Sequence, residues 1–184
     1  MKIPYTHNTP DPEVAIVLEV GKKYGIDEAM LIYTSRVEAK DWVILKCKYG
    51  CSSYNKSYCC PPNSISPEAM RSILKEYKRA VLIVGKAKNK EEQAKLRKAL
   101  MEMEKGLIKN NFYKAFALVP GCCTNCETCS AVKEEKCRKP SEKRPCIEGT
   151  GIDVLSLIRK HKKTVQTFED MKKAGESYGL ILLD

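Results

Sequence analysis

The chain has 184 residues, enough for one domain with a substantial core but few for two, so we expect a single domain over residues 1–184. It carries 33 Lys and Arg against 23 Asp and Glu, but the basic residues are not interleaved with aromatic side chains, which disfavours nucleic-acid binding. No apolar run is long enough to span a bilayer and the first residues do not resemble an export signal, so we expect a cytoplasmic protein with no membrane contact.

The first half of the chain predicts two helices and a pair of strands. Asp11 and Pro12 are typical of the start of a helix, and so is Ser66. The predicted elements are a helix over 12–24, strands over 30–35 and 42–46, and a helix over 66–77. The strand over 42–46 would lead directly into Cys47 and hold that cysteine on a rigid base.

The second half predicts a buried sheet and further helices. The continuous apolar run over 80–85 indicates a central strand, and Asn89 caps a long helix with one apolar face. The remaining elements are this helix over 90–108, a strand over 115–119, helices over 152–160 and 168–174, and a strand over 178–183.

The alternation of strands and helices predicts an α/β fold with a single mixed sheet flanked by helices. Two cysteine-rich metal loops, over 47–62 and 120–150, are each inserted after a strand. Ligands often lie beyond the carboxyl ends of strands in such sheets, so we expect both loops at one end of the sheet.

The ten cysteines are clustered, which in a reducing compartment indicates metal binding or redox chemistry more than disulfides. Cys123, Cys126 and Cys129 match the first three positions of the bacterial ferredoxin pattern. The fourth cysteine of that pattern follows after three residues, whereas Cys137 follows after seven. These four thiolates predict a metal site, with an iron–sulfur cluster favoured.

Zinc and unligated structural thiols are the alternatives for this loop. Zinc sites usually combine two Cys-x2-Cys pairs or add histidines, and His7 and His161 both lie far from the loop in sequence. Cys122 adjoins Cys123 but would break the two-residue spacing, so we expect it to pack beside the site rather than bind metal.

The first cysteine loop provides Cys47, Cys51 and Cys60 as candidate ligands. We choose Cys60 over Cys59 because the proline after it holds it extended. Three thiolates leave a cluster one ligand short, so either Cys146 completes the set or one iron keeps an open position for substrate. Three buried apolar thiols without metal are the alternative.

Three patterns occur together in the chain. They are Cys47-x3-Cys51 with Tyr54 and Cys60-Pro61-Pro62; Cys123-x2-Cys126-x2-Cys129-x7-Cys137-Arg138-x-Pro140; and Arg144-Pro145-x-x-Glu148-x-x-Gly151-Ile152-Asp153-Val154. With them, residues from about 37 to 154 resemble a family of prokaryotic predicted metal-binding proteins, classified as a domain of unknown function. The resemblance implies cysteine-bound metal, iron–sulfur above all, with no settled reaction. A serine is frequent in the family at the position of Cys146, and Cys59 and Cys122 are additional to its pattern.

We therefore predict an iron–sulfur protein with one or two clusters, of the [4Fe–4S] type, that passes electrons to a redox partner protein in anaerobic metabolism. An alternative is an enzyme whose three-cysteine cluster at Cys47, Cys51 and Cys60 exposes an iron to a small-molecule substrate. A second alternative is a zinc-stabilised interaction module that uses the basic surface. No catalytic residue is assigned. Glu148 and Asp153 either join a substrate site or favour the N-terminus of the following helix.

Overall fold

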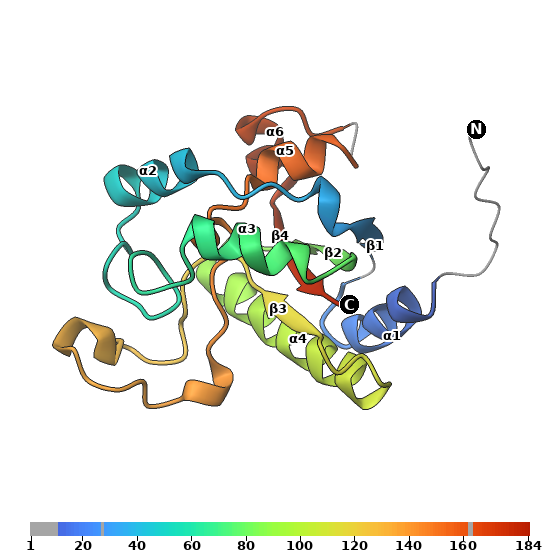
Figure 1. Cartoon of the computed structure of the whole chain (residues 1–184), viewed down its shortest axis with the longest axis horizontal. Helices are drawn as coiled ribbons and strands as arrows, with labels where there is room; N and C mark the ends of the chain where they lie inside the picture. The colour runs from blue at the N-terminus through green and yellow to red at the C-terminus, as the bar shows by residue number, and fades with distance from the viewer. Residues whose placement is uncertain (1–10, 27, 162–163) are drawn as a thin grey trace.

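A four-stranded antiparallel sheet forms the centre of the computed structural model, which describes residues 11–26, 28–161 and 164–184 (Figure 1). The strand order is β1-β2-β4-β3. The strands are β1 (Glu28–Tyr33), β2 (Arg79–Lys86), β3 (Phe116–Leu118) and β4 (Glu176–Leu182). The prediction of one sheet flanked by helices is confirmed, but the sheet is antiparallel throughout its described strands rather than mixed.

The described residues form six α-helices: α1 (Pro12–Lys22), α2 (Asp41–Gly50), α3 (Pro67–Lys75), α4 (Lys90–Lys109), α5 (Val154–Arg159) and α6 (Phe168–Ala174). Capping side chains start several of them as the sequence predicts. Ser66 Oγ accepts from the Ala69 amide at 3.2 Å, and Asn89 Oδ1 accepts from the Glu92 amide at 2.9 Å. Asp11 occupies the N-cap of α1, but its side chain makes no capping hydrogen bond.

Alternate residues of β2 face two separate hydrophobic cores, as expected of a strand buried on both faces. Leu82 packs in the core that α3 and α5 cover, whereas Ile83 packs in the core that α1 and α4 cover. Leu157 of α5 and Leu100 of α4 are fully buried in these two cores. The sheet is therefore the middle of three layers.

One predicted strand is wrong. Residues 42–46 lie in α2, so Cys47 is carried by a helix and the first cysteine loop does not follow a strand. The run Trp42-Val43-Ile44 has high β propensity, but no described strand pairs with it, and propensity yields to tertiary context in such segments. Val43 is the one residue of α2 that is buried.

The last strand also lies elsewhere than its place in the chain suggests. β4 pairs with both β2 and β3 and so lies inside the sheet, while β3 is an edge strand. Val119, just beyond β3, donates its amide to the Pro145 carbonyl at 3.0 Å and accepts from the Ile147 amide at 2.9 Å. This short parallel bridge closes the second cysteine loop at its base.

Both cysteine segments lie outside the two hydrophobic cores. Among the described residues, neither core contains a side chain from 40–64 or from 120–146. Both segments extend from the same end of the molecule (the left-hand side of Figure 1). None of the helices in the described ranges is long and apolar enough to cross a membrane.

Candidate metal centre

Two buried charges on α4 hold the ends of the second cysteine loop. Arg97, 4% exposed, donates to the carbonyl oxygens of Pro120 at 3.0 Å and Gly121 at 2.7 Å, where the loop begins. Glu104, two helical turns further along, accepts from Arg144 at 2.7 and 2.5 Å, where the loop ends. Both ends of the loop are therefore fixed to one face of α4.

Glu104 also connects this ion pair to the sheet. Its Oε2 accepts from the Ala117 amide of β3 at 2.8 Å, and the Arg144 guanidinium lies 5.4 Å from the centre of the Phe116 ring. The hydrogen bond to Glu104 raises the pKa of Arg144. A bidentate, buried pair of this kind fixes position as well as charge.

All four cysteines of the ferredoxin-like pattern line one small hollow inside this loop. The hollow, which we call the loop hollow, has a volume of about 20 Å³; its lining includes Cys123, Cys126, Cys129, Cys137 and the basic residues Arg138 and Lys139. Each of the four cysteines is half-buried. The four cysteines of the sequence pattern thus lie around the same hollow in the fold.

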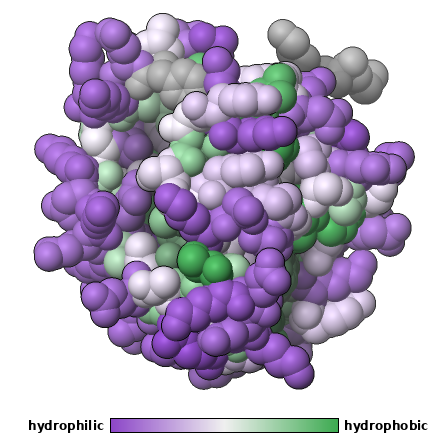
Figure 2. All heavy atoms as spheres, turned by 90° about the vertical axis from the view of Figure 1, so that its left-hand side faces the viewer, coloured by the Kyte–Doolittle hydropathy of each residue, from purple (hydrophilic) through white to green (hydrophobic). Residues whose placement is uncertain are grey.

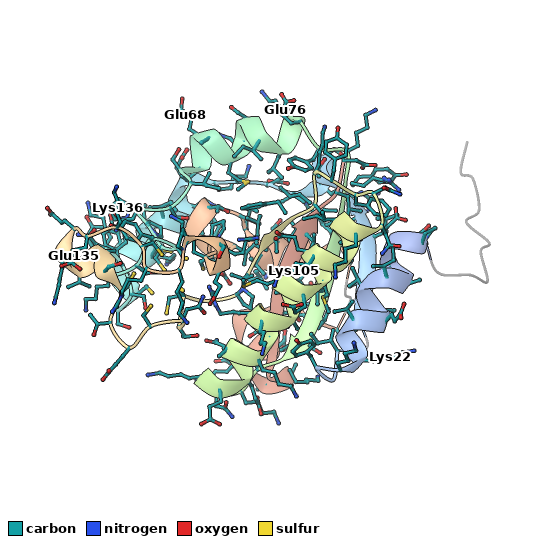
Figure 3. The ribbon with its side chains drawn as sticks, turned by 90° about the horizontal axis from the view of Figure 1, so that it is seen from below. Lys22, Glu68, Glu76, Lys105, Glu135 and Lys136 are labelled. Atoms are coloured by element: carbon teal, nitrogen blue, oxygen red, sulfur yellow. The ribbon has the colours of Figure 1, made fainter. Side chains whose placement is uncertain are left out.

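A second, larger space lies between the first cysteine loop, the start of the second loop and the turn after it. This space, the helix cavity, has a volume of about 260 Å³, and its lining includes Cys47, Cys51, Cys60, Cys122 and Cys146. The three predicted ligands of the first loop are therefore brought together. Figure 3 shows the sulfur atoms gathered at the end of the molecule where Glu135 and Lys136 are labelled.

Adjacent cysteines in the two loops serve different spaces. Cys122 lines the helix cavity whereas Cys123 lines the loop hollow. Cys60 lines the helix cavity, and its neighbour Cys59 makes a side-chain hydrogen bond with Cys123. We expected Cys122 only to pack beside the loop site, but it lines the helix cavity.

In the Cys59–Cys123 pair, one thiol is the hydrogen-bond donor and the other sulfur is the acceptor. The Cys59 thiol donates to Cys123, which lowers the pKa of Cys123 to about 5 despite its burial, and the Asn125 amide and Arg97 favour the thiolate further. The same hydrogen bond, together with burial, raises the pKa of Cys59. Cys123 is therefore prepared as a thiolate, the form that binds metal.

The helix cavity has the opposite electrostatics. Burial, then the nearby Cys122 and Cys51 sulfurs, raise the pKa of Cys60 to about 12. Burial, then Cys51 and Glu148, raise the pKa of Cys47. Thiolates so close together repel one another, so a cation bound among them would favour their ionised forms.

Cys146 and Glu148 form a local pair at the wall of this cavity. The Cys146 Sγ lies 3.1 Å from Glu148 Oε2, to which it donates, and burial raises the pKa of both groups. Asp153 Oδ1 accepts from the Ser156 amide at 3.0 Å and caps α5, in agreement with the second of the two alternatives given for it. Glu148, for which the same two alternatives were given, lines the cavity.

The donor set suits a soft metal group. Within the described residues, no three His, Cys, Asp or Glu side chains are arranged to hold a single metal ion. Four sulfurs around one zinc ion stand only about 3.8 Å apart, since each Zn–S bond is about 2.3 Å. In a [4Fe–4S] cube each thiolate binds a different iron, so the sulfurs stand further apart.

In the part of the chain that the structure describes, no histidine lines either space. His161 lies on the turn after α5 with its Nδ1 2.9 Å from the Leu157 carbonyl oxygen, and His7 lies outside the described residues. A groove of about 870 Å³ between the segment after β1 and α3 is larger than both spaces, but its lining residues include no cysteine. It carries no recognisable chemistry.

Sequence reasoning missed the two α4 anchors and the position of Cys122. A signal for the anchors was present, because Arg97 and Glu104 adjoin the apolar positions Leu96, Leu100 and Met103 of an otherwise hydrophobic helix face. A charge next to such a face is often buried and paired.

An α/β fold with two thiol-lined spaces at one end is the arrangement of a candidate metal-binding protein. Residues 30–183 match the model of a family described as predicted metal-binding protein (DUF2284), and the chain belongs to this family. No curated protein and no solved structure matches the chain. The family resemblance predicted from the cysteine motifs is confirmed.

Proposed function

We propose that the chain is an iron–sulfur protein in which Cys123, Cys126, Cys129 and Cys137 hold a [4Fe–4S] cluster that transfers electrons. The observation that carries the proposal is the convergence of these four thiols on one hollow in a loop closed at its base. When bound, the cluster supplies a one-electron redox centre whose potential depends on nearby charge and solvent.

The second cysteine loop would gain stability from a bound metal centre. Among its described residues, 120–145 contribute no side chain to either hydrophobic core, and only the short 3-10 turns Ser130–Lys133 and Pro140–Glu142 interrupt its irregular path. Irregular segments of this length are uncommon in compact folds unless they are functional. Metal binding contributes folding free energy where apolar burial does not.

The charges around the loop hollow also favour the proposal. A [4Fe–4S]²⁺ core with four thiolates carries roughly two negative charges. Arg138 and Lys139 line the hollow, and Arg97 stabilises the Cys123 thiolate. A hollow of about 20 Å³ has room for little more than one water molecule, which needs roughly 10–15 Å³, so the loop must open as the cluster forms.

An acidic redox protein is the partner we propose. α2, the helix that carries Cys47, exposes Trp42, Leu45 and Tyr49 at a helical spacing that places them on one face. Lys46 and Lys48 are exposed on the same short helix. Figure 2 faces this end of the molecule and shows hydrophobic side chains scattered among hydrophilic ones.

The other candidate functions have less support. An enzyme with an open iron requires only three thiols around the helix cavity, whereas five line it. A zinc-stabilised module requires sulfurs close enough to share one ion, which the described cysteines are not.

Anaerobic purification with iron and sulfide analysis tests the proposal. We expect a broad visible absorbance that dithionite bleaches, with loss of the loop cluster in Cys126→Ser. Cys146→Ser, the same exchange outside the loop hollow, should keep that cluster. A colourless protein with stoichiometric zinc, or full iron retention in Cys126→Ser, would refute the proposal.

The partner surface has its own matched test. Tyr49 and Tyr113 are both 79% exposed, but Tyr113 lies in the turn after α4, away from α2 (Figure 1). Tyr49→Glu should slow reduction by an acidic ferredoxin and weaken its dependence on salt, because the change adds repulsion at the interface. Tyr113→Glu should leave the rate unchanged; equal effects of the two variants would contradict the assignment.

A further inference from the structure

The helix cavity gathers more thiols than the sequence motif assigned to the first loop. Cys47, Cys51 and Cys60 are joined there by Cys122 and Cys146, which arrive from the two ends of the second cysteine loop. Five sulfurs from three segments around one space are more than structural packing requires. Either Cys122 or Cys146 could therefore complete a set of four ligands with Cys47, Cys51 and Cys60.

The first three thiols converge because of local geometry. Cys47 and Cys51 are four residues apart at the C-terminus of α2, where the Cys51 amide donates to the Cys47 carbonyl at 3.1 Å, so both side chains project from one face. Cys60 is buried and returns on the opposite side of the loop, which the hydrogen bond from the Asn55 amide to the Pro61 carbonyl closes at 2.8 Å.

Cys122 is directed into the cavity by the fixed start of the second loop. Arg97 holds the carbonyls of Pro120 and Gly121, and Gly121 has a φ of +63°, a left-handed conformation that favours glycine. The chain turns there, and the two cysteines that follow project to opposite sides. Cys122 faces the helix cavity, and Cys123 faces the loop hollow.

Cys146 is already engaged. Its thiol donates to the Glu148 carboxylate at 3.1 Å within the same turn, and its amide donates to the Cys59 carbonyl at 2.9 Å. Cys122 makes no hydrogen bond of this kind among the described residues. Of the two added thiols, Cys122 is the one available to bind metal.

We propose that Cys47, Cys51, Cys60 and Cys122 bind a second iron–sulfur cluster in the helix cavity. The kind of metal group rests on the proposed function, but the ligand set rests on the cavity alone. The helix cavity, with a volume of about 260 Å³, is far larger than the loop hollow of about 20 Å³. Ligation releases the thiol protons to solvent.

Two neighbouring clusters follow from this assignment. The Cys122–Cys123 peptide bond spans the boundary between the two spaces, and Cys59, the neighbour of Cys60, makes a side-chain hydrogen bond with Cys123. The two centres are then separated by a single layer of cysteine residues. Such proximity allows direct electron exchange and magnetic coupling between them.

Iron content and EPR of anaerobic protein test the assignment. Wild type should contain about eight iron ions per chain, and Cys122→Ser about four, with the loop cluster intact. The reduced wild type should give a broadened, interacting EPR spectrum that becomes that of one isolated cluster in Cys122→Ser. Cys146→Ser, the matched control, should keep about eight iron ions and the interacting spectrum.

The outcomes separate this inference from the proposed function. About four iron ions in wild type, lost in Cys126→Ser but kept in Cys122→Ser, would overturn the second cluster and leave the loop cluster standing. Eight iron ions in wild type with the loss confined to Cys146→Ser would overturn the ligand assignment. Absence of iron from every variant and from wild type would overturn the proposed function itself. Retention of about four iron ions by Cys122→Ser would also show that this variant folds.

Discussion

Removing Arg144 should destabilise the protein more than removing the charge of its partner. The Glu104 side chain is 4% exposed and that of Arg144 is 17% exposed, so Arg144→Gln leaves the more deeply buried charge unpaired. Loss of one member of a buried ion pair costs about 3–5 kcal/mol. For a chain of this size, 3 kcal/mol lowers the melting temperature by roughly 6–12 °C.

Glu104→Gln should lower the free energy of unfolding by less, about 1.5–3 kcal/mol, which is the range for a hydrogen bond to a charged group. In Glu104→Gln the amide oxygen can still accept from the Ala117 amide, and Arg144 is exposed enough to reach water. Glu102→Gln is the matched control on the same helix. Its pair with Lys105 is solvent-exposed, so the cost should stay below about 1 kcal/mol.

Urea unfolding of the three anaerobically prepared variants, with iron content measured in parallel, gives the comparison. We expect the order Arg144→Gln, then Glu104→Gln, then Glu102→Gln, with iron lost more readily from the first two. Equal free energies of unfolding for Arg144→Gln and Glu102→Gln would refute the claim that this pair holds the end of the loop.

Three further outcomes are expected. In metal-free protein, mass spectrometry should find Cys123 alkylated first; its lowered pKa of about 5 keeps the thiolate present above that pH, and the rate should fall only as pH drops through it. Cys59→Ala should move this midpoint upward, and an unchanged midpoint would contradict the hydrogen bond. Metal removal should speed tryptic cleavage after the exposed lysines of 133–143, because the loop backbone that carries them loosens, and peptide mapping should find cleavage elsewhere constant. Arg97→Met should shorten the half-time of iron loss to a chelator, and an unaltered half-time would exclude its anchoring role.

The sequence predicted best where local signals and packing agree. The apolar run of β2 and the capped, periodic helix α4 were both placed within about one residue of their observed bounds. The segment 42–46 failed because its β propensity is a local property, whereas strand formation needs a partner, and none of the described strands pairs with it. The interior position of β4 was equally inaccessible, since pairing order is decided by the whole sheet.

The same distinction applies to the cysteines. Spacing alone grouped Cys123, Cys126, Cys129 and Cys137, because intervals of two residues keep thiols within one small loop. Spacing favoured Cys123 for the loop site, but it could not show where the Cys122 side chain would point, since that depends on the backbone conformation. The left-handed conformation of Gly121 and the contacts of Arg97, which lies on α4 24 residues before Gly121, decide it.

Adjacent cysteines are therefore better interpreted as a pair serving two spaces than as a choice between a ligand and a bystander. One Cys-Cys step can contribute a thiol to each of two neighbouring sites when its two side chains point to opposite sides. The step at 122–123 does so here, because Cys122 lines the helix cavity and Cys123 lines the loop hollow. At 59–60, Cys60 lines the helix cavity, whereas Cys59 supports the loop hollow indirectly through its hydrogen bond with Cys123.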